Sequence, residues 1–319
     1  MNKSTKIWLI TAISLIVIGC ILFVGAMMAL NFDFKNLSTV KYETNDYVIS
    51  DTYKNVTVIT DTADIKFIPS EETSVVCHEE TKAKHRVEVK DDTLVIAIDN
   101  NKKWYDYIGI FNLDKTQITV NIPAGEYGDI TIKSSTGNVE LPRELNFKNI
   151  DISESTGDVT NFASASDRIK ISTSTGNIRV EGITAGVLDL SVSTGKITVT
   201  DVAVTGDINL KVSTGKSYLT DVACLSLIST GNTGDITLKN VIAEAKFDIV
   251  RSTGDVKLEG CDAAELRIET DTGDVVGTLL SEKIFITESD TGRIDVPKTI
   301  NGGRCEIITD TGDIGIEIE

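Results

Sequence analysis

The sequence has little of what many enzymes and nucleic-acid-binding proteins use. Its 319 residues include two histidines, four prolines and 6 % aromatic residues, and the formal net charge is −17. An acidic surface argues against nucleic acid or anionic lipid as an electrostatic partner. The five cysteines form no CxxC pair and have no metal-ligand spacing. No serine lies in a nucleophile-elbow context, which argues against a Ser-His-Asp hydrolase.

Charged residues are absent from Ile7 to Leu30, a run of 24 residues that is long enough to span a bilayer as a helix. Lys3 and Lys6 precede it, so the positive-inside bias favours a cytoplasmic N-terminus and an extracytoplasmic remainder. We therefore predict a single-pass protein of the cell membrane. Two alternatives stay open: a cleaved signal peptide, and a lipoprotein modified at Cys20, which ends the phrase Val-Ile-Gly-Cys.

A short phrase, Thr-Gly followed by a polar residue and then usually Val or Ile, recurs through the chain from residue 130 to the end. The repeat period is 19 or 20 residues, which is typical of a solenoid. The ten repeat glycines are Gly137, Gly157, Gly176, Gly195, Gly215, Gly234, Gly254, Gly273, Gly292 and Gly312.

Apolar residues fill four columns of this repeat, seven and five residues before each glycine and two and four residues after it. Alternation with period two on both sides of a glycine indicates two short strands with one buried face. Ser217, Ser229 and Thr287 are exceptions in the first three columns, and eight of the ten residues are apolar in the fourth. The sequence thus predicts an all-β fold, a right-handed parallel β-solenoid (β-helix) of about ten coils. A hairpin-based sandwich or propeller is the alternative, although propeller blades need about 40–50 residues per repeat.

The region before the regular coils is strand-rich but irregular. Residues 59–65 nearly copy residues 308–314, with Ala63 in place of the glycine, so we expect degenerate coils that also cap the stack. The predicted organisation is a cytoplasmic stub and transmembrane anchor (1–30), a juxtamembrane linker (31–48), irregular coils and cap (49–129) and regular repeats (130–319).

Two segments suggest contacts with other molecules. An aromatic loop interrupts the front region and is either a binding loop or a flap over the core; its candidate binding residues are Trp104, Tyr105, Tyr107 and Phe111. The strand-like C-terminal segment, residues 315–319, lacks an evident cap. It is expected to be an edge that either pairs with another chain or is blunted by Glu317 and Glu319.

Acidic residues recur directly after the repeat glycines. Asp favours turns, so a structural role is the main hypothesis, with a Ca²⁺ ladder and acid/base work on glycans as alternatives. The cysteines beyond the anchor are expected to be buried free thiols, and we predict no catalytic residue, no metal and no cofactor. The aspartates are Asp158, Asp235, Asp255, Asp274 and Asp313.

With its anchor, irregular front and Ser/Asp-Thr-Gly-Asp-Val/Ile coils, the chain resembles the bacterial domain of unknown function 4097 family, whose β-strand-repeat proteins are also labelled putative adhesins. The resemblance covers roughly residues 44–319 and implies a membrane-tethered or exported solenoid with no established catalytic residues. We therefore expect a non-catalytic, adhesin-like surface binding module or an envelope-stress accessory, with a cell-wall glycan or an envelope protein as partner. A β-helix carbohydrate-active enzyme and a passive or self-associating rod are the alternatives.

Overall fold

The structure is a computed structural model that describes residues 2–29, 31–32, 40–102 and 114–319. Helix α1 (Lys3–Ala29) is exposed along almost its whole length. It is long and apolar enough to cross a membrane, and a signal sequence would share these properties. The helix therefore occupies the segment in which the sequence predicts an anchor.

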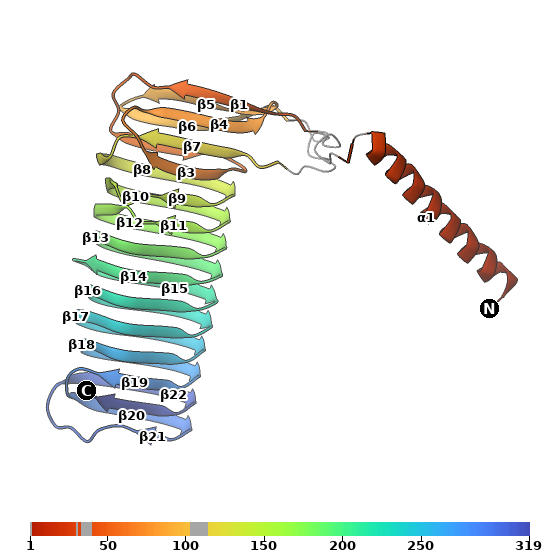
Figure 1. The fold of residues 1–319 in the computed structure, drawn as a ribbon. Coiled ribbons are helices and arrows are strands. Elements are labelled where there is room, and N and C mark those ends of the chain that lie inside the picture. The colour runs from red at the N-terminus through yellow and green to blue at the C-terminus, as the bar shows by residue number, and fades with distance from the viewer. Residues whose placement is uncertain (1, 30, 33–39, 103–113) are drawn as a thin grey trace.

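The rest of the described chain is a tall stack of strands (Figure 1). Most strands pair in parallel with their equivalents one coil away. The strands are β1 (Tyr42–Val48), β2 (Asn55–Ile59), β3 (Asp64–Pro69), β4 (Ser74–Glu80), β5 (Ala83–Lys90), β6 (Thr93–Asn100), β7 (Gln117–Ile122), β8 (Gly125–Thr136), β9 (Val139–Leu141), β10 (Leu145–Thr156), β11 (Val159–Asn161), β12 (Ser164–Thr175), β13 (Ile178–Thr194), β14 (Ile197–Val204), β15 (Asp207–Thr214), β16 (Ser217–Thr233), β17 (Ile236–Thr253), β18 (Val256–Thr272), β19 (Val275–Leu279), β20 (Lys283–Thr291), β21 (Ile294–Asp295), β22 (Gly303–Thr311) and β23 (Ile314–Ile318).

The core runs along the inside of the stack, because each coil is too small to bury its own apolar face. Ile150 of β10 lies opposite Ile130 of β8 on one side and Ile169 of β12 on the other. All three are buried, as are most residues of the four apolar columns. The predicted all-β solenoid of about ten turns is confirmed.

The repeat glycines let the backbones of successive coils approach closely. At Gly157, φ is 152° and an added Cβ would lie 1.6 Å from the carbonyl oxygen of Gly137 in the preceding coil. No side chain fits there without moving backbone. The column is glycine because of this close approach as well as the backbone angle.

The N-terminal end is closed by antiparallel strands. β2 and β3 form a coil that pairs in parallel with β8 and β9, and Ala63 takes the glycine position, as the near-copy in the sequence predicts. Beyond this coil, β5 pairs antiparallel with β6, and β4 pairs antiparallel with both β1 and β7. These antiparallel strands form the cap.

The prediction that residues 31–48 are a linker is wrong from Tyr42 onward, since β1 is a strand of the cap. The half-buried face of β1 carries Glu43, Asn45 and Tyr47. A face made of these residues has no apolar alternation, so the strand cannot be recognised by its hydrophobic period.

The other end of the stack does not follow the order of the sequence. β22 and β23 pair with β18 and β19 on one side and with β20 and β21 on the other. The last coil of the chain is therefore inserted between the two coils that precede it (Figure 1). The prediction that residues 315–319 form an open edge holds only in part. β21 covers Ile314 and Gly315, whereas Ile316, Glu317 and Ile318 pair with β19 alone; the terminal strands of the stack are β20 and β21.

Candidate functional site

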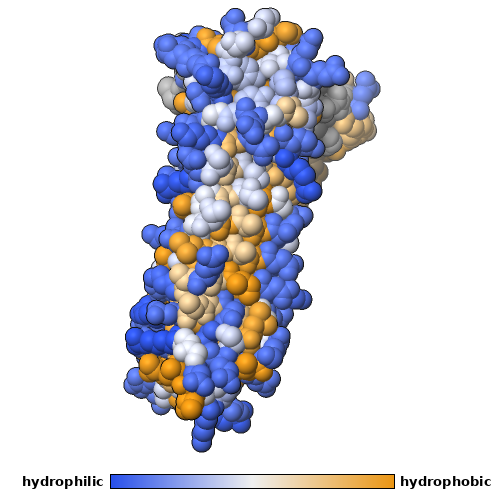
Figure 2. Space-filling model, turned by 90° about the vertical axis from the view of Figure 1, so that its left-hand side faces the viewer, coloured by the Kyte–Doolittle hydropathy of each residue, from blue (hydrophilic) through white to orange (hydrophobic). Residues whose placement is uncertain are grey.

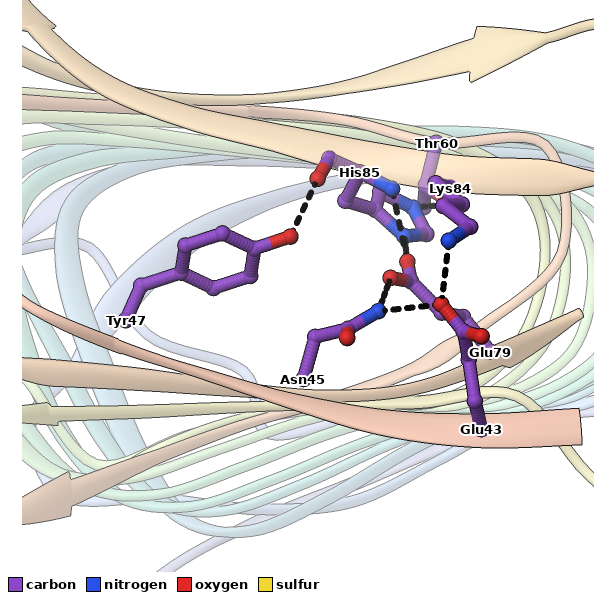
Figure 3. Close-up of polar contacts among 7 residues, drawn as sticks. All are labelled: Glu43, Asn45, Tyr47, Thr60, Glu79, Lys84 and His85. Carbon is purple, nitrogen blue, oxygen red and sulfur yellow. Dashed lines mark hydrogen bonds and ion pairs between the residues drawn. The ribbon is translucent and has the colours of Figure 1, made fainter. Parts of the chain in front are cut away.

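The cap holds a chain of polar contacts between its sheets, formed by Thr60, Glu79 and His85 (Figure 3). The Nε2 atom of His85 lies 2.9 Å from the Thr60 hydroxyl, and its Nδ1 atom lies 2.6 Å from Glu79 Oε2. The His85 backbone N–H also donates to Glu79 Oε2, at 2.6 Å. These residues are 4 %, 0 % and 2 % exposed, in that order. The arrangement places a hydroxyl, an imidazole and a carboxylate in line.

Strand β1 and the start of β5 extend this network toward the surface. Asn45 Nδ2 donates to Glu79 Oε1 (2.7 Å) and to Glu43 Oε1 (2.9 Å). Lys84 Nζ lies 2.5 Å from the same Glu43 oxygen, and hydrogen bonds from Lys84 and then Asn45 lower the pKa of Glu43. Tyr47 donates to the backbone carbonyl of His85 (3.1 Å). Every carboxylate of the network thus has donors.

The order hydroxyl–imidazole–carboxylate is that of a hydrolase triad. Catalysis would require the Thr60 oxygen to reach a substrate, and that side chain is enclosed between the sheets of the cap. The network instead joins β1, β4 and β5 to the end of the β2 strand. Buried polar groups are stabilising only when they are fully paired, as these are.

The sequence analysis missed this network. Its members are spread over residues 43–85 and share no motif. The useful signal is that Glu79 follows Val75 and Cys77 at period two on β4, so that a carboxylate takes a position where an apolar side chain is expected.

Burial and the charge of Glu79 raise the pKa of the Cys77 thiol to about 12.

The aspartates that follow the repeat glycines accept hydrogen bonds from the backbone. Each accepts a hydrogen bond from the backbone N–H at the equivalent position of an adjacent coil, as when Asp255 Oδ1 accepts from Asp274 N at 2.9 Å. The same holds for the other four aspartates of this column. This ladder supports the structural role predicted for them, since each carboxylate satisfies a main-chain donor at a turn.

A further inward column, three residues before each glycine, escaped the sequence analysis because its residue types are mixed. Glu154 is buried there, and neither of its oxygens has a hydrogen-bond partner. Arg251 in the same column is also buried; its Nη2 donates to Ser229 Oγ at 2.8 Å and its Nη1 to the Val250 carbonyl at 3.0 Å. The polar exception at Ser229 is therefore the partner of a buried guanidinium.

The four cysteines beyond the anchor are buried and unpaired, as predicted. The aromatic loop with Trp104, Tyr105, Tyr107 and Phe111 lies outside the described residues, so its role as a binding loop stays a prediction.

An outward face of the solenoid carries a shallow groove of about 460 Å³. Small apolar side chains, Ala203 and Ala223 among them, form its floor together with Ile242, while Asp201 and Asp221 line it as polar neighbours. Figure 2 shows a band of apolar and weakly polar residues running down the molecule between hydrophilic borders. Exposed apolar bands of this kind mark contact surfaces.

Comparison with known proteins identifies the family. Residues 53–215 and 203–319 match the family model described as Toastrack DUF4097. The chain belongs to this family. Known Toastrack-like structures include a "putative adhesin" from Bacteroides fragilis with 19 % identity over 75 % of this chain and 96 % of that one (TM-score 0.44).

Two structures from Parabacteroides distasonis are similar as well. One is a "putative adhesin" with 14 % identity, covering 74 % of this chain and 98 % of that chain (TM-score 0.48). The other is named a "putative lipid binding protein", with 17 % identity, covering 74 % and 96 % (TM-score 0.46). None of the curated proteins matches this chain.

Proposed function

We propose that this Toastrack protein is a membrane-anchored, extracytoplasmic binding module that holds an uncharged repeating polymer, such as a cell-wall glycan, without cleaving it. Helix α1 would anchor the chain, with the N-terminus in the cytoplasm. The solenoid is joined to this anchor through β1, at the cap end of the stack. The polymer would lie along the grooved face.

The proposal rests on one observation: the same pair of residue types, one polar and one small and apolar, is repeated along that groove. Successive coils place Asp201, Asp221 and Asn240 at one position and Ala203 and Ala223 at the next outward position. Equivalent residues of stacked coils are about 4.8 Å apart. The groove therefore offers a polar group and a small apolar group at a regular spacing of about 4.8 Å, which suits a ligand that is itself a linear repeat.

The chemistry of the lining favours a neutral ligand with hydroxyl groups. Carboxylates accept hydrogen bonds from hydroxyls and repel anions. Asp221 Oδ1 accepts one bond from Asn240 Nδ2 at 2.8 Å, which leaves its second oxygen for a ligand. The small side chains leave room for a sugar ring to approach the sheet.

The alternatives fit the described residues less well. A glycan-cleaving enzyme needs an accessible pair of carboxylates, one as acid and one as base or nucleophile. The repeat aspartates recur in one column along the stack and not as a single acid/base pair, and the imidazole–carboxylate pair of the cap is enclosed. A passive spacer is favoured by the regularity of the coils, but it gives no reason for an apolar groove between hydrophilic borders.

The test is a co-sedimentation assay with insoluble cell-wall glycan, using the full chain in detergent micelles. In Ala223→Trp, a large ring fills the groove at an outward, exposed position, and we expect at least tenfold weaker retention. Ser193→Trp is the matched control, because Ser193 is exposed on β13 outside the groove. The soluble fraction is assayed for released sugar.

Equal retention of both variants would refute the groove as the contact surface. Weaker retention in Trp104→Ala and Tyr107→Ala, with Ala223→Trp unaffected, would place the contact on the aromatic loop instead. Released oligosaccharide would refute the non-catalytic function. No retention of the wild-type chain on glycan would favour a protein partner or a spacer.

A further inference from the structure

Three different metal-binding side chains meet inside the cap. Cys77 and Glu79 occupy neighbouring inward positions of β4, and His85 faces them from β5. All three are buried, with exposures of 2 % or less. The thiol sulfur, a carboxylate oxygen and an imidazole nitrogen lie within 4.8 Å of one another. Within the described part of the chain, no second group of this kind is found.

We propose that Cys77, Glu79 and His85 bind a divalent transition-metal ion of the Zn²⁺ type. A mixed set of thiolate, imidazole and carboxylate matches zinc, whereas Ca²⁺ and Mg²⁺ take oxygen ligands alone. This set becomes visible only when β4 and β5 are brought face to face, because the three residues have no zinc-motif spacing in the sequence.

The distance between the imidazole and the carboxylate permits the ion with a small adjustment, and the thiol, within 4.8 Å of both, would move toward it. The Nδ1 atom of His85 and the nearer Glu79 oxygen are 2.6 Å apart. Tetrahedral zinc with bonds of about 2.0 Å to each would hold these two atoms roughly 3.3 Å apart. The ion would therefore take the place of the hydrogen bond between these two atoms, which would separate by less than about 1 Å. Zinc would complete its four ligands with a water molecule.

The groups that surround the ligands are already those that a metal site needs. A metal-bound histidine commonly donates its other ring N–H to an oxygen, and a metal-bound carboxylate is itself hydrogen-bonded. His85 Nε2 faces Thr60 Oγ1 at 2.9 Å, and Glu79 Oε1 accepts from Asn45 Nδ2 at 2.7 Å. With Nδ1 on the ion, Nε2 carries the proton and donates it to Thr60.

The position of the site explains what the ion would do. β4 belongs to one side of the cap, with neighbours β1 and β7, and β5 belongs to the other, with neighbour β6. The ion would link these two sides across the interior at the point where the regular stack ends. An ion that binds only the folded chain stabilises the folded state. We therefore expect the cap, which holds the ligands, to gain the most stability.

The experiment is a titration of the full chain in detergent micelles, stripped with a chelator, with Co²⁺ as a spectroscopic substitute for Zn²⁺. We expect thiolate-to-cobalt charge-transfer absorption at one ion per chain, which Zn²⁺ abolishes by competition. Cys77→Ser should lose this absorption. Cys305→Ser and Cys20→Ser are the controls and should keep it, since neither thiol lies near His85.

A second variant separates metal binding from folding. Thr60→Val leaves all three ligands in place and removes only the outer hydrogen bond, so the affinity for Co²⁺ should fall about 10–100-fold while absorption at saturation is retained. Circular dichroism verifies that each variant is folded. Absence of the charge-transfer absorption in the wild-type chain, or its persistence in folded Cys77→Ser, would overturn the proposal.

Discussion

The buried carboxylate of Glu154 should make the solenoid less stable as the pH rises. Burial raises the pKa of this group to about 7 from an ordinary value of 4.5, although contacts with the Ser134 hydroxyl and the backbone of Thr156 and Ser155 partly offset the effect. The side chain is 4 % exposed and lies between Ser134 of β8 and Thr173 of β12. Neither oxygen has a hydrogen-bond partner at full bonding geometry, so its neighbours stabilise the charge only weakly.

The magnitude follows from linkage between protonation and folding. Because the folded pKa is above the unfolded one, the folded chain binds the proton more tightly, and no charge is buried below about pH 4.5. Between about pH 4.5 and 7 the free energy of unfolding falls as the pH increases. A difference of about 2.5 pH units, at about 1.4 kcal/mol each, gives a loss of about 3 kcal/mol above pH 7.

The matched variant is Glu154→Thr, because threonine occupies the same column at Thr173, Thr270 and Thr309. There its hydroxyl donates to the carbonyl of a repeat glycine in the adjacent coil. We expect the variant to exceed the wild-type chain in free energy of unfolding by about 3 kcal/mol at pH 8 and by much less at pH 4.5. Urea denaturation of the full chain in micelles, followed by circular dichroism, measures both. A difference that does not change with pH would refute the reasoning.

Three further predictions concern the packing of the coils and the open end of the rod. Gly157→Ala forces a Cβ onto a neighbouring carbonyl and should lower the free energy of unfolding by more than about 3 kcal/mol in urea denaturation, whereas Gly315→Ala, whose nearest neighbour would be 3.7 Å away, should be close to neutral. Ser229→Ala removes a partner of the buried Arg251 guanidinium and should cost about 1–3 kcal/mol in the same assay; no change would mean that water replaces the hydroxyl. Ile286→Lys places a charge on the open edge β20, so sedimentation velocity should show less self-association of an unchanged fold if the rod associates through its end.

The regular coils could be predicted because their information is local and repeated. Each apolar column, read at period two on either side of a glycine, is an inward column of the structure, and Ala63 could be aligned with the glycines from its flanking residues alone. The cap network could not be predicted in this way. Glu43, Asn45 and Glu79 are inward-facing yet polar, and only the pairing of β1 with β4 shows that they satisfy one another.

The polar exceptions to the columns mark places where the structure departs from the repeat. Ser229 lies beneath a buried arginine, and Asn161 replaces an apolar residue by bonding to the backbone of Ala163. Thr287 is half-buried because its coil is the last of the stack. A repeat analysis that averages over coils discards these positions, although they mark where the architecture departs from the repeat.

The insertion of the last coil between two earlier ones can also be explained by a polar exception in an apolar column. At the column five residues before the glycine, β22 carries Ile307 and β20 carries Thr287. The observed order buries the isoleucine fully and leaves the threonine at the open end, whereas the sequential order would expose Ile307, at a cost of about 1.5–3 kcal/mol. The backbone can thread between two coils because of Gly302, where φ is 106° and a Cβ would lie 1.8 Å from the Glu282 carbonyl. A chain with alanine at this position should be unable to adopt the inserted order, so the edge of the rod depends on this glycine together with the polar threonine.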